Sequence, residues 1–165
     1  LTNFVKALNE RGKGVISARN ANGEWSQPAF LTLTGASFGL QIGGQSVDLV
    51  LVIMNRKGLE KLLQNEFKFG ADASAVVGTV GREAVAPTDL YLRAEIIGYS
   101  RTRGLFAGIT LKGSTLKADR DANERFYGYP YSSGQIVLEE EPATPHNAKA
   151  VSDWLAALAA GVPTN

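Results

Sequence analysis

The chain of 165 residues has the length of one domain with a sizeable core, and its 44% hydrophobic and 20% charged content excludes a disordered, collagenous or coiled-coil protein. A net charge of +1 excludes the strongly basic field typical of nucleic-acid-binding proteins, and the absence of cysteine excludes disulfides and thiolate metal sites. The longest apolar run, Leu49 to Met54, is far shorter than the roughly 20 residues that span a bilayer, so we expect no membrane-spanning segment and no signal-like start.

The first residues have the spacing of a short amphipathic helix. Polar residues separate the apolar positions, and Gly12 ends the pattern. We therefore predict a helix over residues 1–10. Its apolar stripe consists of Leu1, Phe4, Val5 and Leu8.

Residues 14–54 change to short runs of β-branched and aromatic residues, which are typical of strands. Tight-turn residues at 20–23 and at Gly43-Gly44 separate these runs. The spacing therefore predicts antiparallel hairpins or a meander. The expected strands are residues 14–19, 29–34, 37–42 and 46–54.

The second half begins with a helical pattern over residues 56–65, where the leucines share one face. Strand patterns return after Gly70. Residues 119–127 are typical of a short capped helix and residues 128–142 of a loop, and a final amphipathic helix is expected to pack on the sheet within residues 143–160. The expected strands of this half are residues 73–80, 90–101, 105–111 and 115–118.

Glycines inside the apparent strands indicate bends in the sheet. The pattern predicts one α+β domain over residues 1–165. Its mostly antiparallel sheet is expected to be strongly curved, barrel-like or sandwich-like, with three to four short helices. The glycines in question are Gly39, Gly78, Gly98 and Gly108.

The chain lacks the residue sets of the common enzyme classes. His146 is the single histidine and lies beyond an acidic loop, so neither a serine-hydrolase base nor a zinc site is expected. Residues 119–123 begin like a calcium loop, but Glu124 and Pro130 stand where that loop requires glycine and glutamate. We therefore predict a protein that is not an enzyme and has no metal and no cofactor.

Two groups of basic residues suit an anionic surface. The first lies beside the apolar stripe, and hydrophobic insertion with phosphate attraction is typical of an interfacial helix. In the alternative interpretation the stripe packs on the sheet and the charges are solvated. The candidate lipid-binding residues are Lys6, Arg11, Lys13 and Arg19 in the first group and Arg101 and Arg103 in the second.

A series of glycine-rich and aromatic motifs runs through the chain in order. They are residues 12–19, 23–30 (GEWSQPAF), 35–45 (GASFGLQIGGQ), 69–74 (FGADAS) and 103–108 (RGLFAG), followed by Asn123 and Tyr127-Gly128. Over residues 12–128 this series resembles the SYLF domain family, also called the Ysc84 family. The amino-terminal segment, Asn3 to Glu10, departs from the more glycine-rich pattern of the family.

The resemblance implies a lipid-binding module, because eukaryotic members of the family bind phosphoinositides and, in some cases, actin. We expect the chain to bind anionic, phosphoinositide-like head groups at a membrane surface, with no nucleic acid as partner. The alternative is a structural cell-envelope protein that binds another protein or a second copy of itself. With no SH3 domain in the sequence, a bacterial member is expected, peripheral to the membrane in the periplasm or cell envelope, with the cytoplasm as the alternative.

Charged residues of the motifs have two open interpretations. They either form a partly buried polar network that holds the sheet together, or they line a head-group pocket. A carboxylate pair among them could also do acid–base work, although the nearby arginines are available as ion-pair partners. The residues are Asp48, Asp72, Arg82 and Glu95, together with Arg101.

Overall fold

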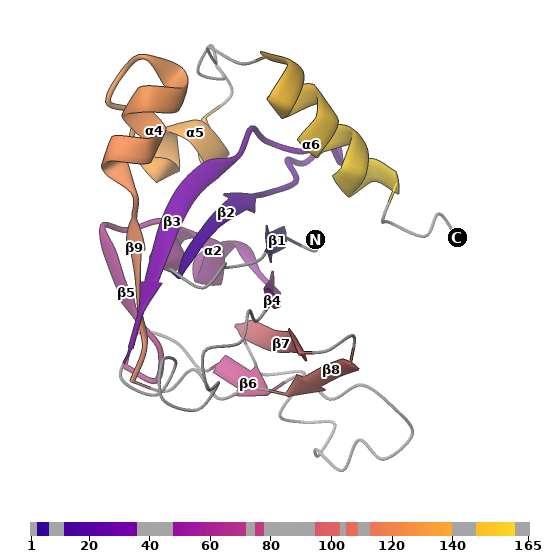
Figure 1. Ribbon diagram of the computed structural model, residues 1–165, viewed down its shortest axis with the longest axis vertical. Coiled ribbons are helices and arrows are strands. Elements are labelled where there is room, and N and C mark those ends of the chain that lie inside the picture. Colours follow the sequence, from indigo (N-terminus) through magenta and orange to yellow (C-terminus); the bar gives the residue numbers. More distant parts are fainter. Residues whose placement is uncertain are drawn as a thin grey trace.

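The computed structural model describes residues 3–6, 12–35, 48–71, 75–77, 95–102, 105–108, 113–139 and 148–160. Within them, strands form one sheet and four helices pack around it (Figure 1). The helices are α2 (Arg56–Leu62), α4 (Arg120–Tyr127), α5 (Ser133–Leu138) and α6 (Ala148–Ala160). The strands are β1 (Asn3–Lys6), β2 (Lys13–Ser17), β3 (Ala29–Thr34), β4 (Asp48–Ile53), β5 (Glu66–Lys68), β6 (Ala75–Val77), β7 (Ile96–Thr102), β8 (Leu105–Gly108) and β9 (Thr115–Ala118).

The described strands follow the order β5-β9-β3-β2-β1-β4-β7-β6, with β8 also paired to β7. Every pairing is antiparallel except that of β6 with β7. The α+β class and the antiparallel pairing are therefore confirmed. The strongly curved, barrel-like or sandwich-like form is wrong, because the described strands make one sheet with an open path whose two ends are not paired with each other.

Glycines predicted to bend the sheet are ordinary members of its ladders. Gly98 is in register with Leu51 on one side and Val77 on the other, and Gly108 is in register with Tyr99. A glycine in a regular strand pairing does not bend the strand, so these glycines do not indicate a closed, barrel-like sheet. The predicted strand at residues 37–42, and Gly39 and Gly78, lie outside the described residues.

The predicted amino-terminal helix is wrong over the residues that the structure describes there. Residues 3–6 form β1, which pairs with β2 on one side and β4 on the other. Neighbouring strands on both sides offer backbone hydrogen bonds to this segment, and Phe4 and Val5 are residue types that favour strands. Tertiary pairing therefore overrides a helical spacing that covered only ten residues.

The core lies on one face of the sheet. Alternate residues of β3 and β4 are buried. Helix α2, whose Leu59 and Leu62 belong to the same core, packs against β4 and β5, and α4 and α5 pack against β3. The helix begins where predicted, because the side chain of Asn55 accepts a hydrogen bond from the Gly58 N–H as its N-cap. The alternating core residues are Ala29, Leu31, Leu33, Leu49, Leu51 and Ile53, joined by Phe67 and Phe69 from β5 and the turn after it.

Two side chains of α4 form hydrogen bonds with the backbone of β3 and of the residue before it. The Asn123 amide accepts a hydrogen bond from the Phe30 N–H at 2.7 Å and donates one to the Phe30 carbonyl at 3.3 Å. The Tyr127 hydroxyl donates to the Pro28 carbonyl at 2.6 Å, and burial raises the pKa of this phenol. These motif residues therefore have structural roles.

Residues 128–142 were predicted as a loop, but residues 133–138 form α5. A sequence signal for this helix was present. Ser132 and Gln135 make a capping box, in which each side chain bonds the backbone N–H of the other residue. Ile136 and Val137 follow directly and are buried in the core.

Helix α6 confirms the predicted carboxyl-terminal packing helix. The Trp154 indole N–H donates to the buried Ser17 hydroxyl of β2 at 2.8 Å, and Val151 is buried. Figure 1 shows α6 at the same end of the sheet as α4 and α5, with β6, β7 and β8 at the other end. No helix among the described residues is long and apolar enough to cross a membrane.

Candidate functional site

One row of side chains crosses four strands on the face of the sheet opposite the core. Lys13 of β2 is in register with Thr32 of β3, Thr32 with Lys117 of β9, and Lys117 with Glu66 of β5. Directly opposite residues in neighbouring strands project from the same face. Because their neighbours Leu31, Leu116 and Phe67 are buried, this row points to solvent.

The residues on either side of this row extend the polar surface. Lys68 lies two residues after Glu66 on β5 and therefore shares its face, and Thr115 and Thr34 are in register on β9 and β3. The side chains of Lys13, Lys68 and Lys117 are 51%, 61% and 50% exposed. We call this surface the lysine face; it comprises Lys13, Lys68 and Lys117 with Thr32, Thr34 and Thr115.

Two carboxylates accompany the three ammonium groups. Glu66 lies 3.1 Å from Lys117 Nζ and 3.4 Å from Lys68 Nζ, and hydrogen bonds from Lys117 and then Lys68 lower the pKa of this exposed carboxyl. Asp119 lies 2.9 Å from Lys13 Nζ. The ion pairs of Glu66 are exposed and contribute little to stability, so an external anion can compete for the ammonium groups of Lys68 and Lys117.

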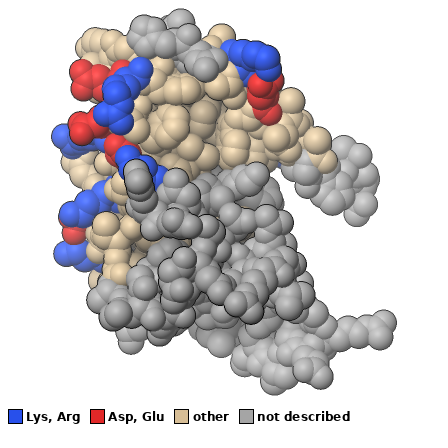
Figure 2. All heavy atoms as spheres, viewed as in Figure 1, with Lys and Arg blue, Asp and Glu red and all other residues tan. Residues whose placement is uncertain are grey.

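The surface continues from the lysine face onto α4. Arg120, its first residue, is exposed and donates a hydrogen bond to the Asn65 side chain, which directly precedes β5. Figure 2 shows basic side chains alternating with acidic ones along the edge formed by β9, β5 and α4. Lysine and arginine side chains therefore gather along one edge, although the net charge of the chain is only +1.

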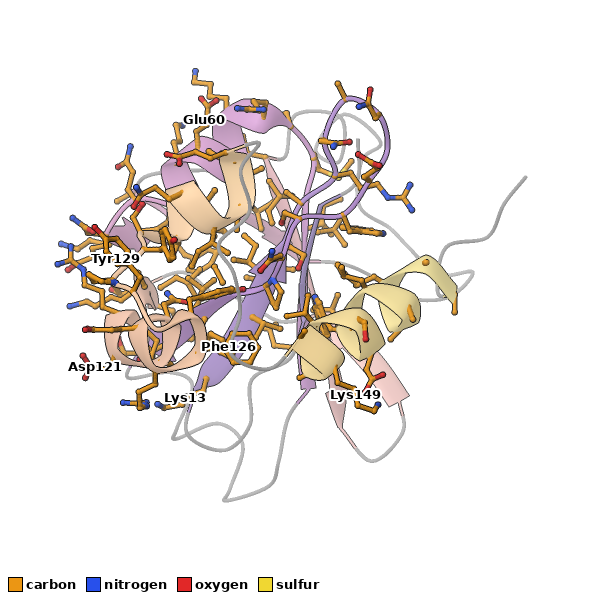
Figure 3. The ribbon with its side chains drawn as sticks, turned by 90° about the horizontal axis from the view of Figure 1, so that it is seen from above. Lys13, Glu60, Asp121, Phe126, Tyr129 and Lys149 are labelled. Atoms are coloured by element: carbon orange, nitrogen blue, oxygen red, sulfur yellow. The ribbon has the colours of Figure 1, made fainter. Side chains whose placement is uncertain are left out.

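A connected set of aromatic rings runs from β3 through the end of α4 to the turn before α5. Phe126 packs edge-on against Phe30 of the sheet, and its ring also contacts Tyr127. Tyr131 contacts Tyr127 at 6.3 Å between ring centroids and Tyr129 at 4.8 Å. Tyr129, at the end of this set, is 59% exposed. Figure 3 shows Tyr129 on the same side of the molecule as Asp121 and Lys13, away from Lys149 on α6.

The structure separates the basic residues that the sequence grouped at the start of the chain. Lys6 belongs to β1 in the interior of the strand order, and Lys13 lies on the lysine face. The guanidinium of Arg19 lies 4.7 Å from the centre of the Trp25 ring, in the β2–β3 connection. Arg11 and Arg103 lie outside the described residues. Since residues 3–6 form a strand, no described helix joins these charges into one interfacial surface.

The predicted polar network is described only in part. Asp48 of β4 and Arg101 of β7 are Cα partners in register, so these two members are neighbours in the sheet. Glu95 pairs with Lys61 of α2 at 3.2 Å, a partner that the sequence did not indicate. Asp72 and Arg82 lie outside the described residues. Among the described side chains, no three potential metal ligands gather at one place.

Sequence reasoning missed Lys68, Lys117 and Arg120 as candidates. A local signal existed for two of them, because Glu66-Phe67-Lys68 and Thr115-Leu116-Lys117 both alternate polar and apolar residues as half-buried strands do. Only the pairing of β5 with β9 places these two segments, about fifty residues apart, side by side.

Asp119 has two partners, and we expect its replacement by alanine to lower the free energy of unfolding by about 1–2 kcal/mol at pH 7. Its carboxylate caps α4 by accepting the Ala122 N–H at 3.0 Å and pairs with Lys13. Burial alone would raise the pKa of this carboxyl, but the hydrogen bonds from Lys13 and Ala122 outweigh it, and the pKa is lowered. Urea unfolding measures the difference between the two proteins.

The lowered pKa of Asp119 determines how the stability difference between the native chain and Asp119→Ala depends on pH. A carboxyl whose pKa is lowered by folding stabilises the fold above its unfolded pKa of about 4, and this contribution is lost as the pH falls through the lower folded pKa. The difference between the native chain and Asp119→Ala should therefore shrink below about pH 4. Asp121→Ala, in the exposed first turn of the same helix, is the control and should change stability by less than about 0.5 kcal/mol. A difference that persists undiminished at pH 2 contradicts this account.

The chain matches one protein family and is similar to several known proteins. The family described as "Ysc84: Las17-binding protein actin regulator" matches residues 34–158. The SH3 domain-containing YSC84-like protein 1 of Xenopus laevis is 30% identical over 145 residues, which cover 87% of this chain and 43% of that protein. The human protein of the same name is 30% identical over 132 residues, 79% of this chain and 39% of its own length.

A yeast relative matches this chain over a similar segment. Protein YSC84 of Saccharomyces cerevisiae is 32% identical over 129 residues, which cover 76% of this chain and 28% of that protein. The chain thus spans less than half the length of the curated relatives that it matches. What these proteins share with the chain is one domain-sized segment.

Proposed function

Because the chain belongs to the Ysc84 family, also called the SYLF family, we propose that it is a non-catalytic domain that binds anionic phospholipid surfaces through the lysine face. The observation that carries this proposal is the register of β2, β3, β9 and β5, which holds three exposed lysines and three threonines on one solvent-facing surface. Of the candidate lipid-binding residues that the sequence predicts, Lys13 belongs to this surface.

The dimensions of the lysine face suit a surface of many head groups. Neighbouring strands lie about 4.8 Å apart, so Lys13 on β2 and Lys117 on β9 are separated by roughly 10 Å at the backbone. This spacing distributes the ammonium groups over an area instead of focusing them on one phosphate. Threonine hydroxyls between them can donate hydrogen bonds to phosphate oxygens. Binding should therefore depend on the charge density of the membrane more than on the stereochemistry of one lipid.

The energetics favour modest, salt-sensitive binding. Each lysine near an anionic membrane contributes about 1 kcal/mol, and the attraction falls off within about 10 Å at 0.1 M salt. Glu66 and Asp119 offset part of this attraction because they compete for the same ammonium groups. We expect a net contribution of about 2 kcal/mol from the three lysines, which is roughly thirtyfold in affinity.

The test is flotation with vesicles that contain phosphatidylserine or a phosphoinositide, compared with phosphatidylcholine vesicles, at two salt concentrations. The combined variant Lys13→Ala, Lys68→Ala and Lys117→Ala should bind the anionic vesicles about thirtyfold more weakly. The matched control is Arg56→Ala, Lys57→Ala and Lys149→Ala, which removes the same number of exposed charges from α2 and α6. Equal losses in both triple variants, or no binding by the native chain to any anionic vesicle, would overturn the proposal.

A protein partner is the second candidate, because the matching family is described as a Las17-binding actin regulator. The same surface could then bind an acidic protein. Cosedimentation with actin filaments, using the same two triple variants, separates this function from lipid binding. Self-association in a bacterial cell envelope, peripheral to the membrane, stays a prediction that analytical ultracentrifugation and cell fractionation can test.

A further inference from the structure

Tyr129 and Met54 are the two large hydrophobic residues that are exposed among the described residues, and Tyr129, at 59%, is more exposed than Met54, at 43%. An isolated exposed apolar residue needs no explanation. Tyr129, however, lies at the end of a ring set that reaches back to Phe30 in the sheet. Its position is therefore tied to the fold.

The backbone around Tyr129 is tightly held. Gly128 ends α4 in the left-handed conformation, and its N–H bonds the Glu124 carbonyl. The Tyr131 N–H donates to the Tyr129 carbonyl at 2.8 Å, and Ser132 then caps α5. Tyr129 thus lies at the tip of a short turn between two capped helices. Little conformational freedom remains to be lost when this tip meets a partner.

The basic side chains of the adjoining surface favour an anionic partner. Arg120, on the same helix that leads to Tyr129, connects to the segment that begins β5, and β5 and β9 carry Lys68 and Lys117. Tyrosine combines an apolar ring with a polar tip and is enriched at the head-group level of membranes. The lysine face, with three ammonium groups against two carboxylates and a tyrosine at its margin, is complementary to an anionic bilayer.

From this arrangement we infer that Tyr129 inserts into the interfacial region of an anionic membrane as an apolar anchor, while the lysine face binds the head groups. This inference rests on the proposed lipid function and adds a residue and an orientation to it. The edge of the molecule formed by β9, β5 and α4 then faces the membrane (Figures 2 and 3).

The absence of cysteine allows a direct test of this orientation, because a single introduced thiol can carry a polarity-sensitive dye. Tyr129→Cys labelled with such a dye should shift to shorter emission wavelength and become protected from aqueous iodide when phosphatidylserine vesicles are added. The matched control is Asn22→Cys, an exposed position in the turn of the β2–β3 connection, which should show neither change. Flotation of both labelled proteins reports whether they are bound.

Unlabelled variants test how much the Tyr129 side chain contributes to the affinity for vesicles. Tyr129→Ala should weaken binding about tenfold without changing its salt dependence, and Tyr129→Phe should bind nearly as the native chain does. If the labelled proteins float with the vesicles but the dye at position 129 stays accessible to iodide, the anchor is wrong and lipid binding stands. If the native chain does not float with anionic vesicles, the proposed function fails and the anchor fails with it.

Discussion

Replacing Gly12 by alanine should lower the free energy of unfolding by at least about 3 kcal/mol. Gly12 has a φ of +66°, and an added Cβ would lie far inside the contact distance of the Leu33 carbonyl oxygen. The same two residues share a backbone hydrogen bond, from the Leu33 N–H to the Gly12 carbonyl. The neighbouring strand cannot move away without breaking that bond, so the clash and the left-handed backbone both destabilise the fold.

A second glycine provides the control for backbone strain. Gly23 has a φ of +84°, but a Cβ there would meet nothing within 4 Å. Gly23→Ala should therefore show only the cost of the left-handed conformation, about 1 kcal/mol. Thermal unfolding followed by circular dichroism should place Gly12→Ala roughly 10 °C below the native chain and Gly23→Ala a few degrees below it. Equal shifts would show that the contact with Leu33 does not matter.

Gly12→Ala should also change the lysine face. Gly12 directly precedes Lys13, and its bond to Leu33 lies beside the register pair Lys13 and Thr32. If the start of β2 is displaced, Lys13 leaves the row that it shares with Lys117. We therefore expect weaker vesicle binding as well, measured well below the melting temperature of the variant.

Asn123→Ala should lower the free energy of unfolding by about 3 kcal/mol. The Asn123 side chain is fully buried and bonds both backbone groups of Phe30. The Phe30 carbonyl keeps a second donor, the Asp119 N–H at 2.9 Å, but the Phe30 N–H loses the acceptor described for it. A buried donor without a partner costs about 1–3 kcal/mol, and the lost amide volume adds to that.

Urea denaturation of Asn123→Ala and of Glu124→Ala separates this effect from a general weakness of α4. Glu124 is the next residue and is exposed, so its replacement should change stability by less than about 0.5 kcal/mol. Comparable losses in both variants would mean that helix propensity, not the bond to Phe30, is responsible. Vesicle binding of folded Asn123→Ala should match the native chain, because this side chain is buried behind the surface.

These expectations distinguish two kinds of residue in the chain. Gly12, Asn123 and Tyr127 belong to the motifs that resemble the family, and the structure accounts for each by a contact within the fold. Lys68 and Lys117 lie outside the quoted motifs and on the exposed surface. A match to the family through such motifs therefore indicates a shared fold more directly than a shared ligand.

The proposed lysine face brings together residues that are far apart in the sequence. Lys13 is a candidate because the first residues of the chain are basic, although the segment that was predicted to present it as a helix is a strand over residues 3–6. Arg19 belongs to the same basic group in the sequence, yet it lies against Trp25 in a connection between strands. Lys68 and Lys117 belong to no basic cluster or motif in the sequence, so no local pattern indicates them.

By itself, the sequence determined the family, the α+β class, the exact bounds of β3 and β9, and the positions of α2, α4 and α6, because local periodicity, turn residues and helix caps specify them. Tertiary structure alone decided that the first residues form an interior strand, that the sheet is open, and that Lys13, Lys117 and Lys68 share one surface. The physical reason is that strand order and register depend on hydrogen bonds between segments far apart in the chain, which no local pattern encodes.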